Sequence, residues 1–129
     1  MIVNQPRKQN TAKQKRGDAG TSSPSSKWVK LIHGKEFITY EGLLAMAHEQ
    51  GLIELSAEFI SVTDKLALAA SYAVFKDGRK FWEAGDATPT NVHPQVKAHF
   101  ARVALTRAKA RVLRDALNIG MVSVEELEE

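Results

Sequence analysis

Three arginines recur along one stretch of the chain at a spacing that suits an anion-binding surface. Arg107, Arg111 and Arg114 follow an i, i+4, i+7 pattern, which places them in one stripe if the stretch is helical. Arg102 and Lys109 lie in the same stretch, and no acidic residue stands between Arg102 and Arg114. Because a guanidinium presents a planar fork of donors to phosphate oxygens, the pattern predicts contacts with a nucleic-acid backbone.

A structural explanation of the same arginines competes with this one. Like charges on neighbouring helical turns cost some stability unless a counter-charge lies near. The arginines would then pair with carboxylates from elsewhere in the fold, such as Glu41, Glu54 or Glu58. The two hypotheses differ in one observable: nucleic-acid binding requires all three guanidinium groups to project together into open solvent.

Further basic residues flank predicted turns. Arg79 and Lys80 follow Asp77-Gly78, and an Asp-Gly pair between two strand-like runs is a strong signal of a β-hairpin. Lys65 opens the strand-like run before that hairpin. We expect these residues to add contacts with the nucleic-acid backbone, although lysines at hairpin tips often serve only solubility.

Three aromatic residues belong to the same predicted hairpin. Tyr72, Phe81 and Trp82 are side chains on which unpaired bases can stack. In a small sheet such residues more commonly form core or subunit interface, so the sequence favours a packing role over a stacking role for them.

The arginine stretch requires a long helix to position it. Pro94 suits a first helical turn, no glycine or proline interrupts the run to about Leu117, and Gly120 follows it. A face of small or aliphatic residues lies opposite the arginines and can pack closely on a sheet: Ala101, Leu105, Ala108, Val112 and Ala116.

The preceding elements are predicted to form that sheet. A short hairpin-like entry is expected in residues 27–40, around Gly34-Lys35, and Thr39 is expected to cap a helix that Gly51 ends. Three strands follow, within 52–62, 66–76 and 79–85, and residues 85–94 are predicted to be a loop. The fold class is therefore α+β, with a helix, a three-stranded antiparallel sheet and a long basic helix.

Charge divides the chain into unequal parts. Of its 18 lysines and arginines and 15 acidic residues, residues 1–26 hold five basic and one acidic. Few large apolar side chains accompany them, so we predict a disordered basic tail in residues 1–26. The remainder has 13 basic and 14 acidic residues, so a basic surface there requires local clustering. Residues 27–122 are expected to form the binding domain and 123–129 an acidic end.

Composition excludes several classes of function. The chain has no cysteine, so disulfides and thiolate chemistry are excluded. Neither a bilayer-spanning apolar run nor a signal-peptide pattern occurs, so we expect a cytoplasmic, nucleoid-associated protein that does not associate with membranes. Glu83, Asp86, His93 and His99 suggest a hydrolase or a metal site, but His93 and His99 lack i, i+4 spacing. Asp86 is expected to turn the loop backbone instead.

A phosphate-cradling glycine motif is also missing from the sequence. We therefore expect no enzyme activity, no cofactor and no use of ATP.

The segment "HFARVALTRAKARVLRDALNIG" resembles the basic helix of the Rad-fifty-two superfamily of single-strand annealing proteins, in its small bacterial and phage members. "GKEFITYEGLLAMAHEQGL", the strand segments and "GDATPTNV" fit the same order of elements, so the resemblance covers roughly residues 28–122. It implies ATP-independent annealing in recombination or repair by a ring or filament of subunits, with single-stranded DNA in a basic groove. Arg111 and Arg114 match basic positions that hold the DNA backbone, whereas Ala110 replaces a basic residue of the eukaryotic members.

Contacts with the phosphate backbone do not by themselves distinguish one nucleic acid from another. A nonspecific RNA-binding or nucleoid-associated module therefore remains the alternative.

Overall fold

The computed structural model describes residues 24–128, which form an α+β unit with two α-helices, a two-stranded sheet and a three-stranded sheet. The α+β prediction is confirmed at this level. In chain order the elements are β1 (Val29–Ile32), β2 (Lys35–Ile38), α1 (Tyr40–Glu49), β3 (Leu52–Val62), β4 (Ala67–Phe75), β5 (Lys80–Ala87) and α2 (Phe100–Leu117). Short 3-10 turns lie at Ser26–Trp28, Pro94–His99 and Val124–Glu126.

Local signals in the sequence account for most element boundaries. The Thr39 side chain accepts a hydrogen bond from the Gly42 backbone N–H at 3.0 Å and so caps α1. Gly78 has φ +93°, a conformation that glycine adopts without strain, and this permits the tight β4–β5 turn. Both the predicted cap and the predicted Asp-Gly turn are confirmed.

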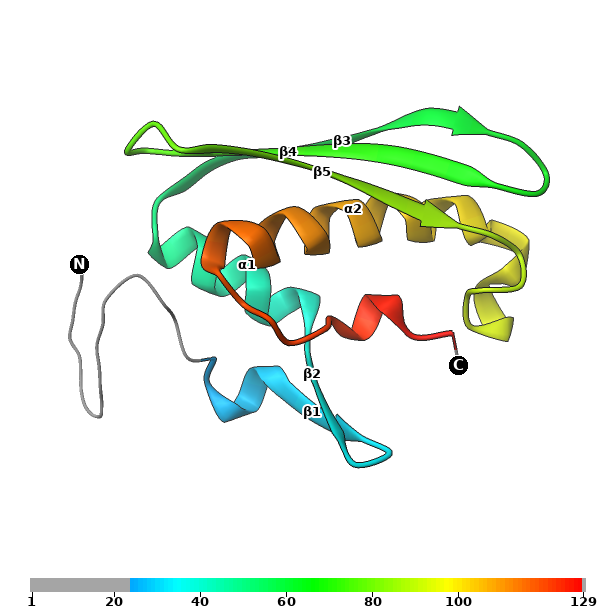
Figure 1. Ribbon diagram of the computed structural model, residues 1–129, viewed down its shortest axis with the longest axis horizontal. Helices are drawn as coiled ribbons and strands as arrows, with labels where there is room; N and C mark the ends of the chain where they lie inside the picture. The colour runs from blue at the N-terminus through cyan, green and yellow to red at the C-terminus, as the bar shows by residue number, and fades with distance from the viewer. Residues whose placement is uncertain (1–23, 129) are drawn as a thin grey trace.

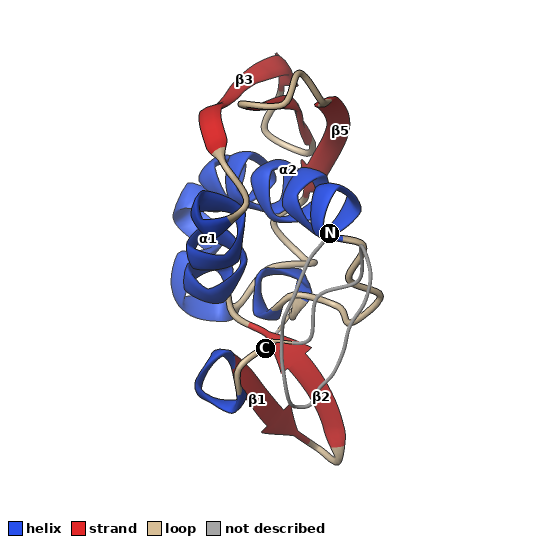
Figure 2. Cartoon of the chain, turned by 90° about the vertical axis from the view of Figure 1, so that its left-hand side faces the viewer, coloured by secondary structure: helices blue, strands red, loops and turns tan. Residues whose placement is uncertain are grey.

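The three-stranded sheet is antiparallel in the order β3-β4-β5, and α2 runs across one of its faces (Figures 1 and 2). The residues of β4 alternate between buried and half-buried, and the buried ones form the face toward α2. The Ser71 hydroxyl on that face donates to the Ala108 carbonyl at 2.6 Å. A Cβ on Gly85 would overlap backbone atoms of Ala104 and Ala108, so glycine permits the close approach of β5 to α2.

The main core lies between α1, the second half of α2 and the end of the three-stranded sheet at the β4–β5 turn. Its largest buried side chains include Leu43, Phe75, Leu113 and Leu117. Beneath it, the β1–β2 hairpin projects from the body (Figure 1). A parallel bridge between Ile38 and Ser123 joins this hairpin to the C-terminal segment. Residues 123–128, which the sequence sets apart as an acidic end, therefore pack onto the same unit.

Two sequence-based boundaries need correction. The long helix does not begin at Pro94, because Pro94–His99 form a 3-10 turn and α2 starts at Phe100. The predicted loop is shorter, since β5 continues through Asp86 to Ala87.

Most of the predicted disordered tail, residues 1–23, lies outside the described residues. Within residues 24–128, no helix combines the length and apolar character needed to cross a membrane.

Candidate nucleic-acid interface

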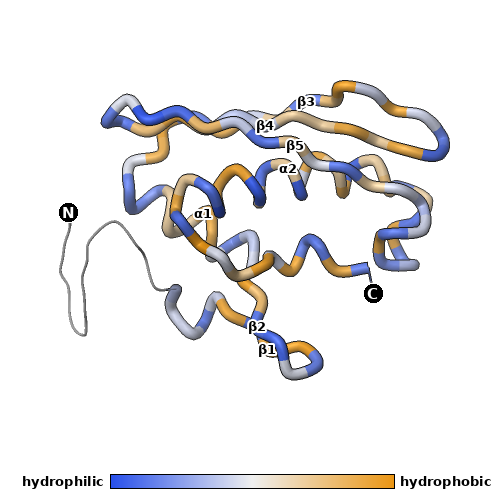
Figure 3. The backbone as a smooth tube through the Cα atoms, in the orientation of Figure 1, coloured by the Kyte–Doolittle hydropathy of each residue, from blue (hydrophilic) through white to orange (hydrophobic). Residues whose placement is uncertain are grey.

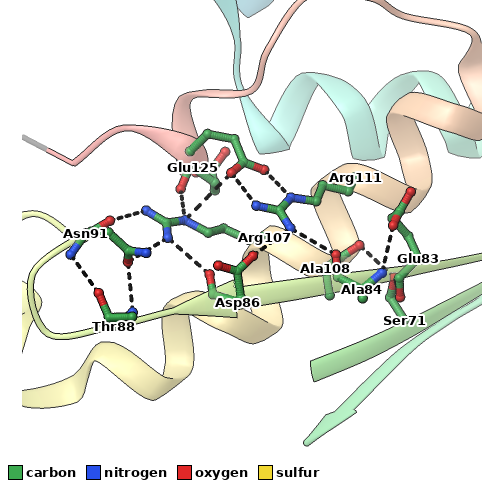
Figure 4. A network of polar contacts seen from close by, with 11 residues as sticks. Ser71, Glu83, Ala84, Asp86, Thr88, Asn91, Arg107, Ala108, Arg111 and Glu125 are labelled. Atoms are coloured by element: carbon green, nitrogen blue, oxygen red, sulfur yellow. Dashed lines mark hydrogen bonds and ion pairs between the residues drawn. The ribbon is translucent and has the colours of Figure 1, made fainter. Parts of the chain in front are cut away.

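Arg107 lies inside the protein. Only 3% of its surface is exposed, and its guanidinium donates to the carbonyls of Asp86, Asn91 and Glu125 at 3.1, 2.6 and 2.8 Å. It also donates to the Asn91 side-chain oxygen at 3.0 Å (Figure 4). Burial lowers the pKa of Arg107 below its ordinary value, despite the nearby carboxylate of Glu126. This side chain therefore holds α2, the 88–93 loop and the C-terminal segment together.

Arg111 forms a two-pronged ion pair with Glu126. Its Nε and Nη2 lie 2.7 and 2.8 Å from the two carboxylate oxygens. Its Nη1 donates to the Asp86 carboxylate at 3.0 Å and to the Ala84 carbonyl at 3.1 Å. The hydrogen bonds that Arg111 donates to Glu126 are the main reason why the pKa of Arg111 is raised. Each of its three nitrogen atoms therefore donates to a partner within the fold, although 29% of the side chain stays exposed.

Arg114, one turn further along, donates through Nη2 to the Gly120 carbonyl at 3.0 Å. Its Nε is buried and has no hydrogen-bond partner among the described residues. The expectation that Arg107, Arg111 and Arg114 project together into open solvent is therefore wrong. The competing structural explanation is correct in kind, but the carboxylates are Asp86 and Glu126 rather than Glu41, Glu54 or Glu58.

The arginines act at an exposed edge of the sheet. β5 is an edge strand, and such strands present unpaired backbone groups that attract other chains. Arg111 and Arg107 donate to the carbonyls of Ala84 and Asp86 along this edge. The stripe therefore closes part of the β5 edge, and Asp86 serves as an ion-pair partner within the strand rather than as a loop cap.

The other basic candidates are dispersed. Arg102 is exposed and Lys109 half-buried on another side of α2, where the Lys109 ammonium lies 5.6 Å from the Tyr40 ring. Lys65 lies in the β3–β4 turn, whereas Arg79 and Lys80 lie at the β4–β5 turn. These two turns are at opposite ends of the sheet (Figure 1). The eight predicted DNA-binding residues therefore do not form one surface.

The face of the three-stranded sheet turned away from α2 is uncovered in the described part of the chain (Figure 2). Trp82 lies on this face with 70% of its surface exposed. It pairs across the strands with Tyr72, and the ring centroids are 4.3 Å apart with an interplanar angle of 43°. We call these two residues the aromatic platform. Phe81, the third aromatic candidate, points inward and meets Phe75 edge to face.

Charge is distributed unevenly around the aromatic platform. Lys80 lies opposite Val74 on the β5 side, and Glu54 lies opposite Val74 on the β3 side. The β4–β5 turn beyond them is hydrophilic (Figure 3). Its Arg79 is bound to Asp77 at 2.8 Å and lies over the Phe75 ring. The positive end of the aromatic platform is therefore the β4–β5 turn, and its β3 side is acidic.

The residues considered for a hydrolase or metal site are not gathered into one. Within residues 24–128, no group of three or more histidine, aspartate or glutamate side chains is placed to hold a metal ion. Glu83 instead shares a hydrogen bond with Asp115. Burial of Asp115, together with this hydrogen bond, raises the pKa of Asp115. His93 and His99 lie at the N-terminal end of α2, beside a cavity, whereas Asp115 lies near the C-terminal end of that helix.

Comparison with known proteins adds no assignment. No family model, no curated protein and no solved structure matches the chain.

Sequence reasoning missed the carbonyls and carboxylates that bind the arginines. Asn91, which binds Arg107 twice, lies in a segment that predicted only a loop. A usable signal existed for Glu126, because an acidic run close to a basic helix in a nearly neutral domain favours internal neutralisation.

Proposed function

We propose that this protein binds single-stranded DNA on the uncovered face of its three-stranded sheet and anneals complementary strands without ATP, in recombination or repair. The observation that carries the proposal is the exposure of Trp82, a large aromatic side chain in tilted contact with the Tyr72 ring on a face that no element within residues 24–128 covers. Aromatic side chains on such a surface stack with unpaired bases regardless of sequence.

Stacking of this kind is compatible with annealing. An aromatic ring contacts the flat face of a base and leaves its hydrogen-bonding edge free for a complementary strand. Annealing makes and breaks no covalent bond, so it requires neither a nucleophile nor a metal. The order of helix, three antiparallel strands and long helix is the order that the resemblance to the Rad-fifty-two superfamily leads one to expect.

The backbone of the bound strand would follow the basic end of the aromatic platform. Lys76, Arg79 and Lys80 surround the β4–β5 turn, with Asp77 as the acidic residue among them. Three of the 13 basic residues in 27–129 are occupied internally on α2. We therefore expect a shallower salt dependence than an exposed arginine stripe would give.

A homo-oligomer is the second part of the proposal. β3 is the other edge strand of the sheet, and it exposes Ile53, Phe59, Ile60 and Val62. A long apolar edge is a template for pairing with another chain. Because arginines occupy part of the β5 edge, β3 is the edge available for a second copy.

The test compares four activities of the full chain at matched salt. Fluorescence anisotropy measures binding to single-stranded DNA, duplex DNA and RNA of the same sequence, and a strand-pairing assay without nucleotide or metal measures annealing. Preferential single-strand binding with faster annealing is expected. Equal binding to all three, without annealing, would instead indicate a nonspecific nucleic-acid-binding module and would contradict the proposal.

Sedimentation velocity tests the oligomer. We expect an assembly that Ile60→Lys weakens, because a charge on the strand edge opposes pairing. A chain that is monomeric with and without DNA would contradict this part while leaving strand binding open to its own test.

A further inference from the structure

The uncovered face of the three-stranded sheet carries negative charge beside the aromatic platform. Ser56 on β3 lies directly opposite Tyr72, so Glu54 and Glu58, two positions to either side of Ser56, are on the same face of the strand. Both glutamates are exposed, and neither forms an ion pair with another described residue. Because carboxylates repel a phosphate backbone and attract cations, the β3 side of this face favours a positively charged partner.

The rings of the aromatic platform also suit a cation. Basic side chains lie over other rings of the described chain: Lys27 over Trp28, Lys35 over Phe37, Arg79 over Phe75 and Lys109 over Tyr40. No basic side chain of residues 24–128 lies over Trp82 or Tyr72. Trp82 is nevertheless 70% exposed, and tryptophan is the residue whose ring attracts cations most strongly. The rings and the two carboxylates together therefore form a site for a guanidinium or ammonium group.

The chain carries such groups in the segment that precedes the described residues. Residues 1–23 contain five basic side chains and one acidic side chain. Two adjacent basic pairs occur among them, Arg7-Lys8 and Lys15-Arg16. The charge of this segment is therefore complementary to that of the two glutamates, and each pair offers a guanidinium for a ring and an ammonium for a carboxylate.

The length of the segment decides which pair reaches the aromatic platform. The described chain begins beneath α1, on the side away from the three-stranded sheet (Figures 1 and 2). A domain of about 100 residues is about 35 Å across, so a path over its surface to the opposite side is about 55 Å long. Arg7 lies 17 positions before Pro24, and an extended chain covers about 58 Å over that separation. Lys15 lies nine positions before Pro24, which corresponds to only about 30 Å, so Arg7-Lys8 is the pair within reach.

We propose that residues 1–23 fold back over the uncovered face, where the Arg7 guanidinium lies on the aromatic platform and the Lys8 ammonium pairs with Glu54 or Glu58. Covalent attachment gives the segment an effective concentration in about the millimolar range, at which individually weak contacts are sufficient. A single strand is proposed to bind the same face, so the segment covers the aromatic platform until a strand displaces it. Only this last consequence rests on the proposed function.

Acrylamide quenching of the Trp82 emission measures the cover directly, in the full chain and without DNA. The Trp28→Phe background leaves Trp82 as the single tryptophan. Arg7→Gln with Lys8→Gln should raise the quenching constant about twofold, because the ring loses a cover that tethering keeps in place most of the time. About 0.5 M NaCl, which screens exposed charges beyond a few ångströms, should raise the constant of the parent chain to the same value.

The chain supplies a matched control for the basic pair. Lys15→Gln with Arg16→Gln removes the same charge from the same segment, but this pair is too close to Pro24 to reach the aromatic platform. We expect it to leave the quenching constant nearly unchanged. Equal increases in the two double variants would overturn the assignment to Arg7-Lys8, because they would show only a general attraction between the segment and the domain.

The carboxylate side of the site is tested in the same way. Glu54→Gln with Glu58→Gln should raise the quenching constant as much as the substitution of Arg7-Lys8 does. Glu41→Gln with Glu49→Gln is the control, because both residues are exposed glutamates on α1. An equal effect of the two glutamate variants would overturn the role of the uncovered face. Combining the two active double variants should give no further increase, since both remove the same contact.

The same segment of a second copy is the alternative occupant. Ile60→Lys distinguishes the two, because it opposes assembly through the β3 edge. A quenching constant that stays low in Ile60→Lys and does not depend on protein concentration supports the chain's own segment. Protection of Trp82 that is lost in Ile60→Lys or on dilution would overturn that assignment in favour of a neighbouring copy.

A quenching constant that is the same in the parent chain, in the Arg7-Lys8 variant and in the Glu54-Glu58 variant would overturn the proposal, because Trp82 would then lack this cover. Such a result leaves strand binding on the aromatic platform open to its own test. Conversely, a protected Trp82 in a chain that binds no single strand would overturn the proposed function alone.

Discussion

The β5 edge and the uncovered sheet face lie next to each other and reverse the usual placement of residue types. At the edge, the cationic Arg107 is 3% exposed and surrounded by oxygen atoms. On the face, the apolar Trp82 is 70% exposed and has Tyr72 as its ring neighbour. The basic residues are thus part of the framework, and the aromatic residue is available to a partner.

This contrast shows that helical spacing identifies which side chains share a stripe but not what lies opposite that stripe. The residues opposite come from β5, the 88–93 loop and the C-terminal segment, which are distant in sequence. A guanidinium that suits phosphate suits carboxylates and carbonyls equally well. Whether it binds a ligand is therefore decided by tertiary packing.

The largest effect is expected at Arg107. Replacing Arg107 with Met should lower the free energy of unfolding by about 3 kcal/mol or more, because several buried oxygen atoms would lose their donor. Urea denaturation measures this change. Arg102→Met is the control on the same helix, where an exposed arginine should cost less than about 0.5 kcal/mol. Equal, small effects for both variants would show that the buried network contributes little.

Trp82 is expected to show the opposite behaviour. Trp82→Ala should weaken single-stranded DNA binding by about 1–3 kcal/mol, the usual worth of one stacked base, while stability changes little because the side chain is exposed. Leu31→Ala is a matched control, since Leu31 is 72% exposed on the distant β1–β2 hairpin. Equal losses of affinity in the two variants would rule out a specific role for the aromatic platform.

Arg111 sharpens the comparison, because its side chain is only partly exposed. Arg111→Met should cost about 1–2 kcal/mol of stability through loss of its paired contacts with Glu126. The slope of binding affinity against salt should remain unchanged when folded protein is compared. A slope that falls by about one unit would instead assign a phosphate contact to Arg111.

The smallest effect is a pH dependence at Glu125. Its folded-state pKa is raised above 4.5 by burial, so the folded protein keeps this proton over a range in which the unfolded chain has lost it. Stability from this group is therefore present below pH 4.5 and is lost as the pH rises through the folded pKa. Glu125→Gln should remove that component, which urea denaturation at several pH values detects as a stability gap that widens with pH. A constant gap would contradict the raised pKa.

The sequence predicted the framework better than the site. Thr39 and Asp77-Gly78 act through neighbours within three residues, so their roles could be derived from local rules. The partners of Arg107 lie 16 to 21 positions away, and no spacing rule identifies such pairs. The sequence favours a packing role for Trp82, because most aromatic residues in small sheets are buried. Its exposure follows from the absence of a covering layer in the described chain, which strand propensities do not predict.

We propose that single strands bind on the sheet face and not on the arginine stripe. The most direct measurement follows the fluorescence of Trp82 in a Trp28→Phe variant, which leaves Trp82 as the single tryptophan of the chain, while a dT oligonucleotide is added. We expect saturable quenching by the single strand, weaker quenching by the duplex, and the same curve when Arg111→Met is added. Strand binding that leaves the Trp82 emission unchanged, or that disappears with Arg111, would contradict it.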